Sequence, residues 1–186
     1  MNAEVRERIL QATYDCVARW GLAKTSIEDA AREAGLSRAT IYRYFPGGRD
    51  ELIGAVIQWE FVRFFLRLYE EVRDVDTLEE VMEKALTFAH HAVLEHQVLQ
   101  RILVTEPEIL LPHMTVSANR TREWVSAFLK PYLVRHGMHE GADLERAADF
   151  LARMVLSYIG SPGRWDLDDP TQVARLVRCE LLAGIR

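Results

Sequence analysis

Apolar residues recur every three or four positions along nearly the whole chain, and this spacing constrains the fold more than any other feature of the sequence. Such spacing is typical of amphipathic helices, whereas a half-buried strand alternates apolar and polar residues. No long alternating pattern occurs. The sequence therefore predicts an all-α fold of about nine helices, with an N-terminal three-helix unit fused to a larger C-terminal helical bundle. The expected helices lie near residues 4–20, 26–34, 37–45, 50–73, 77–95, 97–105, 115–136, 143–159 and 170–184.

Glycines, hydroxyl residues and prolines mark the expected ends of these helices. Gly35 follows an apolar-periodic stretch, as a helix-ending glycine does. Thr25 and Glu28 have the spacing of a capping box, in which each side chain satisfies a free backbone N–H. Pro107 is expected in a connection, and Pro131 is expected to kink or break a helix because proline removes a helical hydrogen bond.

The chain changes character near residue 50. Before that point the expected helices are short, and after it they are long and apolar, so we place the domain boundary between residues 1–49 and 50–186. The net charge of −5 is also uneven: residues 1–50 hold eight basic and seven acidic residues, and the rest hold fifteen and twenty-one. The stretch 36–49 contains three arginines and no acid. A locally basic element on an acidic body is typical of a protein that contacts phosphate through one surface.

Several classes of protein are disfavoured. No apolar stretch approaches the length of a membrane span, and the charged N-terminus lacks the apolar region of a secretory signal, so a cytoplasmic protein without a membrane partner is expected. Cys16 and Cys179 match no disulfide or zinc spacing. His91 and His96 fall on different helix faces, which disfavours a metal site. Because no catalytic motif occurs either, we expect no catalytic residues, no metal and no cofactor.

Residues 26–45 have the pattern of a helix-turn-helix. Four small or apolar residues share one face of the first helix, which allows a second helix to cross closely: Ile27, Ala30, Ala31 and Ala34. Gly35 supplies the turn, Ser37 is a favourable N-cap for the second helix, and Ile41 and Phe45 point to the core. The second helix then presents a polar outer face suited to a major groove. The alternative is a helical hairpin with an ordinary polar exterior.

Arginine, tyrosine and hydroxyl side chains of this segment suit contact with bases and phosphates. Double-stranded DNA is thus the expected partner. The predicted DNA-binding residues are Lys24, Thr25, Ser26, Ser37, Arg38, Ala39, Thr40, Tyr42, Arg43, Tyr44 and Arg49.

The segment IEDAAREAGLSRATIYRYFPGGRDELI resembles the N-terminal DNA-binding unit of the TetR family of transcriptional regulators, which has the pattern A-x-x-A-G-V-S-x-x-x-L-Y-x-H/Y-F. The resemblance covers about residues 5–55. Two features depart from it. The segment from Phe45 to Arg49 is one residue longer than the common F-x-x-K, and Tyr44 stands where histidine is frequent.

The resemblance implies a homodimer, usually a repressor, that binds a palindromic operator and is released by a small lipophilic effector bound in the C-terminal body. The alternative function is that of a helical small-molecule-binding protein with a vestigial DNA surface.

Aromatic and histidine side chains of the body are the candidates for the effector pocket, with a simple bundle core as the other interpretation. These are Phe64, Phe65, Phe88, His91, Trp124 and Phe128. The last two helices carry apolar stripes that suit either a dimer interface, as the resemblance implies, or the monomer's own core. The predicted interface residues are Leu151, Val155, Tyr158, Val173, Leu176 and Val177.

Overall fold

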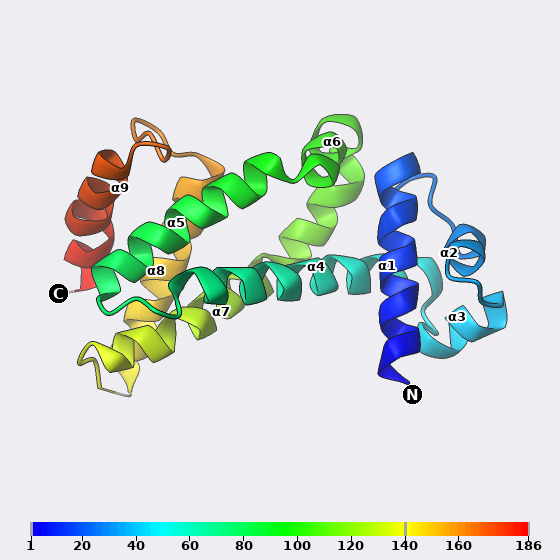
Figure 1. Cartoon of the computed structure of the whole chain (residues 1–186), viewed down its shortest axis with the longest axis horizontal. Helices are drawn as coiled ribbons and strands as arrows, with labels where there is room; N and C mark the ends of the chain where they lie inside the picture. The colour runs from blue at the N-terminus through cyan, green and yellow to red at the C-terminus, as the bar shows by residue number, and fades with distance from the viewer. Residues whose placement is uncertain (1, 140, 186) are drawn as a thin grey trace. The chain divides into compact units, whose positions relative to one another are not determined.

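The fold is all-α, as the apolar spacing predicts. The computed structural model describes residues 2–139 and 141–185, without the side chains of residues 109–118. Nine α-helices follow one another within these residues, and a π-helical turn (Val177–Leu181) and a 3₁₀ turn (Leu182–Ile185) extend the last one (Figure 1). The helices are α1 (Ala3–Trp20), α2 (Ile27–Glu33), α3 (Arg38–Tyr44), α4 (Gly48–Val72), α5 (Leu78–Glu95), α6 (Gln97–Thr105), α7 (Pro107–Arg135), α8 (Ala142–Gly160) and α9 (Pro170–Leu176).

The chain forms two compact units by its internal packing. The first, unit 1, comprises the chain up to Leu66 and the segment His96–Met114. The second, unit 2, comprises Arg67–Glu95 and the chain from Thr115 onward. Unit 1 thus contains α1–α3, the first part of α4, and α6. Because these units are defined by packing and not by role, the boundary between residues 49 and 50 stays a prediction.

Unit 1 is built around the small-residue face of α2. Ala30 and Ala31 are buried, and α1 and α4 supply larger side chains to the same core, among them Ile9 and Leu52. From α3, Ile41 enters this core, and so does Phe45 just after the helix, as the four-residue spacing predicts. A second apolar cluster joins α6 to the rest of unit 1, with Ile102 packed beside Val17, Leu22 and Ile53.

Unit 2 has one continuous apolar core. It is formed by side chains of α5, α7, α8, α9 and the C-terminal turns, and its most buried members include Met82, Leu86, Leu133, Ala148, Leu151, Leu176, Val177 and Leu181. Within it, the ring of Phe150 lies where a side chain on Gly184 would have to be, so the C-terminal 3₁₀ turn packs directly on α8. None of the described helices is both long enough and apolar enough to cross a lipid bilayer.

The behaviour of the prolines differs from the sequence-based expectation. Helix α7 begins at Pro107 and runs without a break to Arg135, so Pro107 opens a helix and Pro131 does not end one. The predicted start near residue 115 is therefore wrong. Proline suits the first turn of a helix because its missing N–H has no intrahelical partner there. At Pro131 the cost of one lost hydrogen bond is offset by the surrounding packing, since Leu129, Tyr132 and Leu133 are buried.

The two cysteines differ in environment. Cys16 is fully buried in unit 1, whereas Cys179 is exposed. Burial raises the pKa of the Cys16 thiol to about 11, and the nearby Glu33 and Asp29 carboxylates contribute to the same shift. A thiol with such a pKa is almost entirely protonated at neutral pH and is a poor nucleophile.

In a Cys179→Ser variant, the remaining thiol of Cys16 is expected not to react with Ellman's reagent in the native protein. It should react with one equivalent once the protein is unfolded in guanidinium. The absorbance of the released thiolate at about pH 8 measures both states. Rapid reaction of the native variant would contradict the buried position of Cys16.

Candidate nucleic-acid interface

The N-terminus of α2 is fixed by a capping box. The Asp29 N–H donates to Ser26 Oγ at 3.2 Å, and the Ser26 N–H donates to Asp29 Oδ2 at 3.2 Å. Hydrogen bonds from Ser26, aided by Arg32, lower the pKa of the Asp29 carboxyl despite some desolvation. The predicted box of Thr25 with Glu28 is wrong, shifted by one residue. Thr25 is buried and its hydroxyl donates to the Gly21 carbonyl at 2.7 Å.

The turn between α2 and α3 closes with a glycine in the left-handed region. Gly35 has φ 63°, a value that an L side chain rarely adopts. Its N–H donates to the Arg32 carbonyl at 3.2 Å, and the Leu36 N–H donates to the Ala31 carbonyl at 2.9 Å. These two bonds form a Schellman motif, which satisfies the last carbonyls of α2. The turn therefore has one defined geometry and sets the angle at which α3 leaves α2.

Helix α3 starts at a serine cap and exposes the predicted face. Ser37 Oγ accepts from the Thr40 N–H at 3.1 Å and lies 2.9 Å from the Thr40 hydroxyl. Most of the predicted DNA-binding residues on the outer arc of α3 are exposed to solvent, namely Arg38, Ala39, Tyr42 and Arg43, whereas Thr40 is half-buried. Ala39 and Arg43 lie on the side of α3 opposite Ile41, which is fully buried, whereas Arg38 and Tyr42 lie closer to the edges of the exposed face.

Three predicted DNA-binding residues are buried or hydrogen-bonded to the backbone of a neighbouring segment of unit 1. Tyr44 is only 8% exposed, and its hydroxyl accepts from the Asn2 N–H at 3.2 Å. Thr25 is 2% exposed. Arg49 donates from Nε to the Thr25 carbonyl at 2.8 Å and from a terminal nitrogen to the Leu22 carbonyl.

The predicted set thus divides into two groups. Lys24 is exposed, and Ser26, the N-cap of α2, is half-buried, so neither is enclosed in the core. Thr25, Tyr44 and Arg49 instead hold unit 1 together.

Acidic side chains of α2 pair with arginines around this surface. Glu28 lies 2.7 Å from the Arg38 guanidinium, and Arg19 binds Glu33 through two hydrogen bonds of 2.6 and 3.0 Å. The hydrogen bonds and charge of Arg19 lower the pKa of the Glu33 carboxyl. The sequence placed Glu28 on the polar face of α2 but did not indicate its partner. Glu28 and Arg38 are ten residues apart on either side of a turn, and such a pair produces no periodic pattern in the sequence.

Two further residues were missed altogether. Arg101 of α6, and Glu106 directly after that helix, hydrogen-bond to the backbone around the α1–α2 loop. Their partners are about eighty residues earlier in the chain. No local pattern in the sequence connects residues so far apart, and both residues look like ordinary surface charges.

The predicted effector residues are divided between the two units. Phe64 and Phe65 of unit 1 contact each other edge to face, with ring centroids 5.3 Å apart. The other four belong to unit 2, where His91 Nε2 lies 2.7 Å from Asp168 Oδ1 and the rings of Phe128 and Tyr132 are 5.4 Å apart. Their assembly around one cavity stays a prediction.

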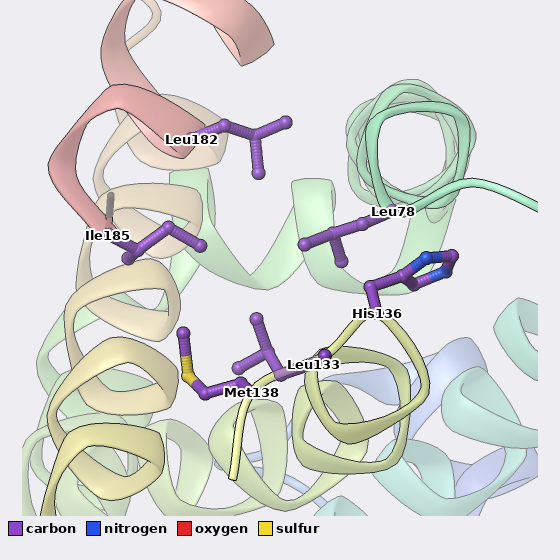
Figure 2. A pocket seen from close by; sticks show the side chains of 7 residues that line it. Leu78, Leu133, His136, Met138, Leu182 and Ile185 are labelled. Carbon is purple, nitrogen blue, oxygen red and sulfur yellow. The ribbon is translucent and has the colours of Figure 1, made fainter.

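A pocket of about 310 Å³ lies in unit 2, at the end of α7 (Figure 2). Apolar side chains surround it, and His136 stands at its edge. The lining residues are Leu78, Leu133, His136, Gly137, Met138, Leu182 and Ile185. None of them is among the predicted effector residues.

The predicted dimer residues are also divided. Four of them are at most 2% exposed within a single chain and belong to the core of unit 2: Leu151, Val173, Leu176 and Val177. Side chains enclosed in this way have no surface to offer a second copy. Val155 and Tyr158 are half-buried, so the surface part of the prediction reduces to this pair on α8.

Two helices joined by a capped glycine turn, with arginines on the outer face of the second, define the N-terminal segment as a helix-turn-helix DNA-binding domain. Residues 9–56 match the family described as bacterial regulatory proteins, tetR family. The chain is 28% identical over 171 residues to Rv1255c, an uncharacterized HTH-type transcriptional regulator of Mycobacterium tuberculosis, covering 92% of this chain and 82% of that protein. It is 33% identical over 81 residues to the HTH-type transcriptional repressor Rv3405c of the same organism, covering 44% of this chain and 42% of that protein.

Solved structures match nearly the whole chain. The TetR family repressor AlkX from Dietzia sp. strain DQ12-45-1b, implicated in biodegradation of n-alkanes, has a TM-score of 0.67 and 25% identity, covering 96% of this chain and 98% of that one. The transcriptional repressor QsdR from R. erythropolis has a TM-score of 0.66 at 16% identity, covering 96% and 95%, and supports the fold alone. The match over residues 9–56 confirms the resemblance found in the sequence, that to helix-turn-helix transcriptional regulators of the TetR family.

Replacing Ser26 by alanine is expected to lower stability by roughly 1 kcal/mol, the usual cost of losing an N-cap side chain. Because the folded-state pKa of Asp29 is lowered, the contribution of its capping bonds is complete above the ordinary pKa of 3.8 and is lost as pH falls through the folded-state pKa. The difference between wild type and variant should therefore shrink in strong acid. Urea unfolding followed by circular dichroism at neutral and acidic pH measures it.

The control is Ser157→Ala, a change of the same kind at an exposed position inside α8. It should leave the unfolding midpoint nearly unchanged at both pH values. Equal midpoints for wild type and Ser26→Ala would show that the capping box does not stabilise α2.

Proposed function

We propose that this chain is a homodimeric, cytoplasmic repressor that binds a palindromic DNA operator and is released from it by a small lipophilic effector. The observation that carries the DNA-binding part is the outer face of α3, where Arg38, Ala39, Tyr42 and Arg43 are exposed. This face fits the groove in which a recognition helix contacts base edges. The repressor function is supported by the likeness to AlkX, which is described as a TetR family repressor.

The exposed side chains have different roles in this proposal. Arg43 contacts a guanine through its two parallel N–H donors, and Ala39 and Thr40 touch the neighbouring bases. Arg38, Tyr42, Lys24, Ser26 and Ser37 bind phosphate oxygens and set the register on the duplex. Thr25 and Tyr44 support these groups from within unit 1, where both are buried.

A dimer would present two copies of α3 to successive turns of one face of the DNA, about 34–36 Å apart. We propose that α8 contributes to the dimer contact through Val155 and Tyr158, which its core packing leaves half-buried. Because both half-sites are bound together, a small change in the spacing of the two α3 helices weakens both contacts at once.

The effector is proposed to be lipophilic because the candidate residues are aromatic. AlkX is implicated in biodegradation of n-alkanes, which supports an apolar molecule as the ligand class for a regulator of this kind. Release requires only that the effector binds one conformation of the body more tightly than the other.

Fluorescence anisotropy of the purified protein on DNA from upstream of its own gene tests this proposal, with a scrambled duplex as control and a salt series for both. The expected dissociation constant for the operator is about 10⁻⁸ M or tighter, at least ~10³-fold below that of the scrambled duplex. Binding of a hydrophobic ligand with no sequence preference on DNA would favour the alternative, a small-molecule-binding protein with a vestigial DNA surface.

Replacing Arg43 by alanine is expected to cost about 1–3 kcal/mol of operator binding and to relax the preference at one base pair of each half-site. The loss arises because the bidentate contact to guanine is removed. Anisotropy titrations against operators substituted at single positions measure it. The matched control is Arg146→Ala, which removes an exposed arginine of unit 2. An affinity of Arg43→Ala equal to that of the control would contradict the role of Arg43.

A further inference from the structure

The end of α1 and the α1–α2 loop that follows it, residues 21–26, are held by three charged side chains, one from α4 and two from α6 and its C-terminal end. Arg49 donates to the Thr25 carbonyl at 2.8 Å and also to the Leu22 carbonyl. Arg101 donates to the carbonyls of Ala18 and Arg19 at the end of α1, at 2.8 and 3.4 Å. Glu106 Oε2 accepts from the Ala23 N–H at 2.9 Å. All of these residues belong to unit 1.

The loop is shaped to receive the Glu106 carboxylate. Gly21 has φ 88°, and a β-carbon built on it would overlap the Glu106 carboxylate. Any larger residue at position 21 would thus displace this side chain. Beneath the polar contacts, Leu22 packs with Ile102 and Ile53 in a buried apolar cluster. The same segment of the chain, residues 101–106, therefore holds the loop by packing and by charged hydrogen bonds together.

Arg101 also satisfies backbone groups that a helix leaves without partners. The last carbonyls of α1 have no intrahelical donor, because the helix ends at Trp20. A guanidinium placed there supplies donors and a favourable charge at the negative end of the helix. Arg49 binds the loop itself, with its donors directed to the carbonyls of Leu22 and Thr25.

The held loop leads directly into two groups that the proposed function assigns to phosphate. Lys24 lies inside it, and Ser26 at its end is the N-cap of α2. A shift of the loop would therefore move both groups relative to α3. By contrast, neither Arg49 nor Glu106 is suited to touch DNA, since Arg49 is bound to carbonyls and Glu106 carries the same charge as phosphate.

We propose that Glu106, Arg101 and Arg49 are positioning residues for DNA binding: they hold the α1–α2 loop and the end of α1 before it, so that Lys24 and Ser26 meet the phosphate backbone. The inference rests on the DNA-binding function and extends it to residues of α6 and to the start of α4. The proposal predicts that Glu106 strengthens DNA binding, although its negative charge alone would weaken it.

Glu106→Ala tests this sign. Removing an acid from a DNA-binding protein ordinarily tightens its binding to DNA, because repulsion from phosphate is lost. Loss of the hydrogen bond to Ala23 should instead weaken binding about fivefold, the equivalent of one hydrogen bond. The control is Glu108→Ala, which removes an exposed acid two residues further on and should leave affinity unchanged or slightly tighter. A third variant, Glu106→Gln, loses the same charge but keeps an oxygen acceptor, and should stay close to wild type.

Anisotropy on a scrambled duplex at low salt is the measurement, since phosphate contacts form on any DNA sequence. It is made well below the melting temperature of each variant, as measured by circular dichroism. Amide hydrogen exchange of Ala23 is followed in parallel by NMR and should be faster in Glu106→Ala alone. If Glu106→Ala binds as tightly as Glu108→Ala, or if Ala23 exchange does not change, the proposal is wrong. A wild type without preference for any sequence would contradict the proposed repressor function and leave this comparison intact.

Discussion

The burial of Ile41 and Phe45 against α1 and α4 is the contact on which the DNA-binding face depends. Both side chains are at most 1% exposed, and they lie on one side of α3 and its C-terminal end. With that side fixed in the core, Arg38, Tyr42 and Arg43 have no orientation left except outward. The Schellman turn at Gly35 then fixes the angle between α2 and α3. A seven-residue helix is too short to be stable by itself, so its position comes entirely from these contacts.

The chain carries a net negative charge, but the acids around the DNA-binding face of unit 1 are paired with arginines. The net charge of −5 means that the protein, taken as a whole, is repelled by DNA. Around α2 and α3, however, the acids are paired with arginines: Glu28 with Arg38, and Glu33 with Arg19. Exposed pairs of this kind add little stability. Their effect is on the local field, because a paired acid repels phosphate less than a lone one and its partner is held in a defined orientation.

The helix-turn-helix could be predicted from sequence because the residues that mark it are close together in the chain. The buried alanines of α2, the glycine of the turn, the Ser37 cap and the apolar pair on α3 lie within twenty residues of one another, and the structure agrees with each. The capping box was misplaced by one residue because Thr25 and Ser26 are both good caps, and burial of Thr25 decides between them. Helix α7 was predicted too short because Pro107 was placed in a connection, whereas proline at this position opens the helix.

Long-range contacts set the limit of prediction from sequence. Arg49, at the start of α4, was assigned to DNA, and its carbonyl partners more than twenty residues earlier could not be foreseen. The apolar stripes of α8 and α9 were equally compatible with the core of a single chain and with a dimer interface. The structure shows that Leu151 and Leu176 lie in the core, so the proposed dimer contact is limited to the half-buried Val155 and Tyr158.

The central claim is that a dimer inserts two copies of α3 into the major groove of a two-fold symmetric site. Selection of bound duplexes from a randomised DNA library, with sequencing of the bound fraction, tests it directly, because the library contains every candidate half-site. The expected result is an inverted repeat whose half-sites are about one helical turn apart, with a guanine preference that is lost in Arg43→Ala. A bound fraction as random as the starting library would contradict the claim.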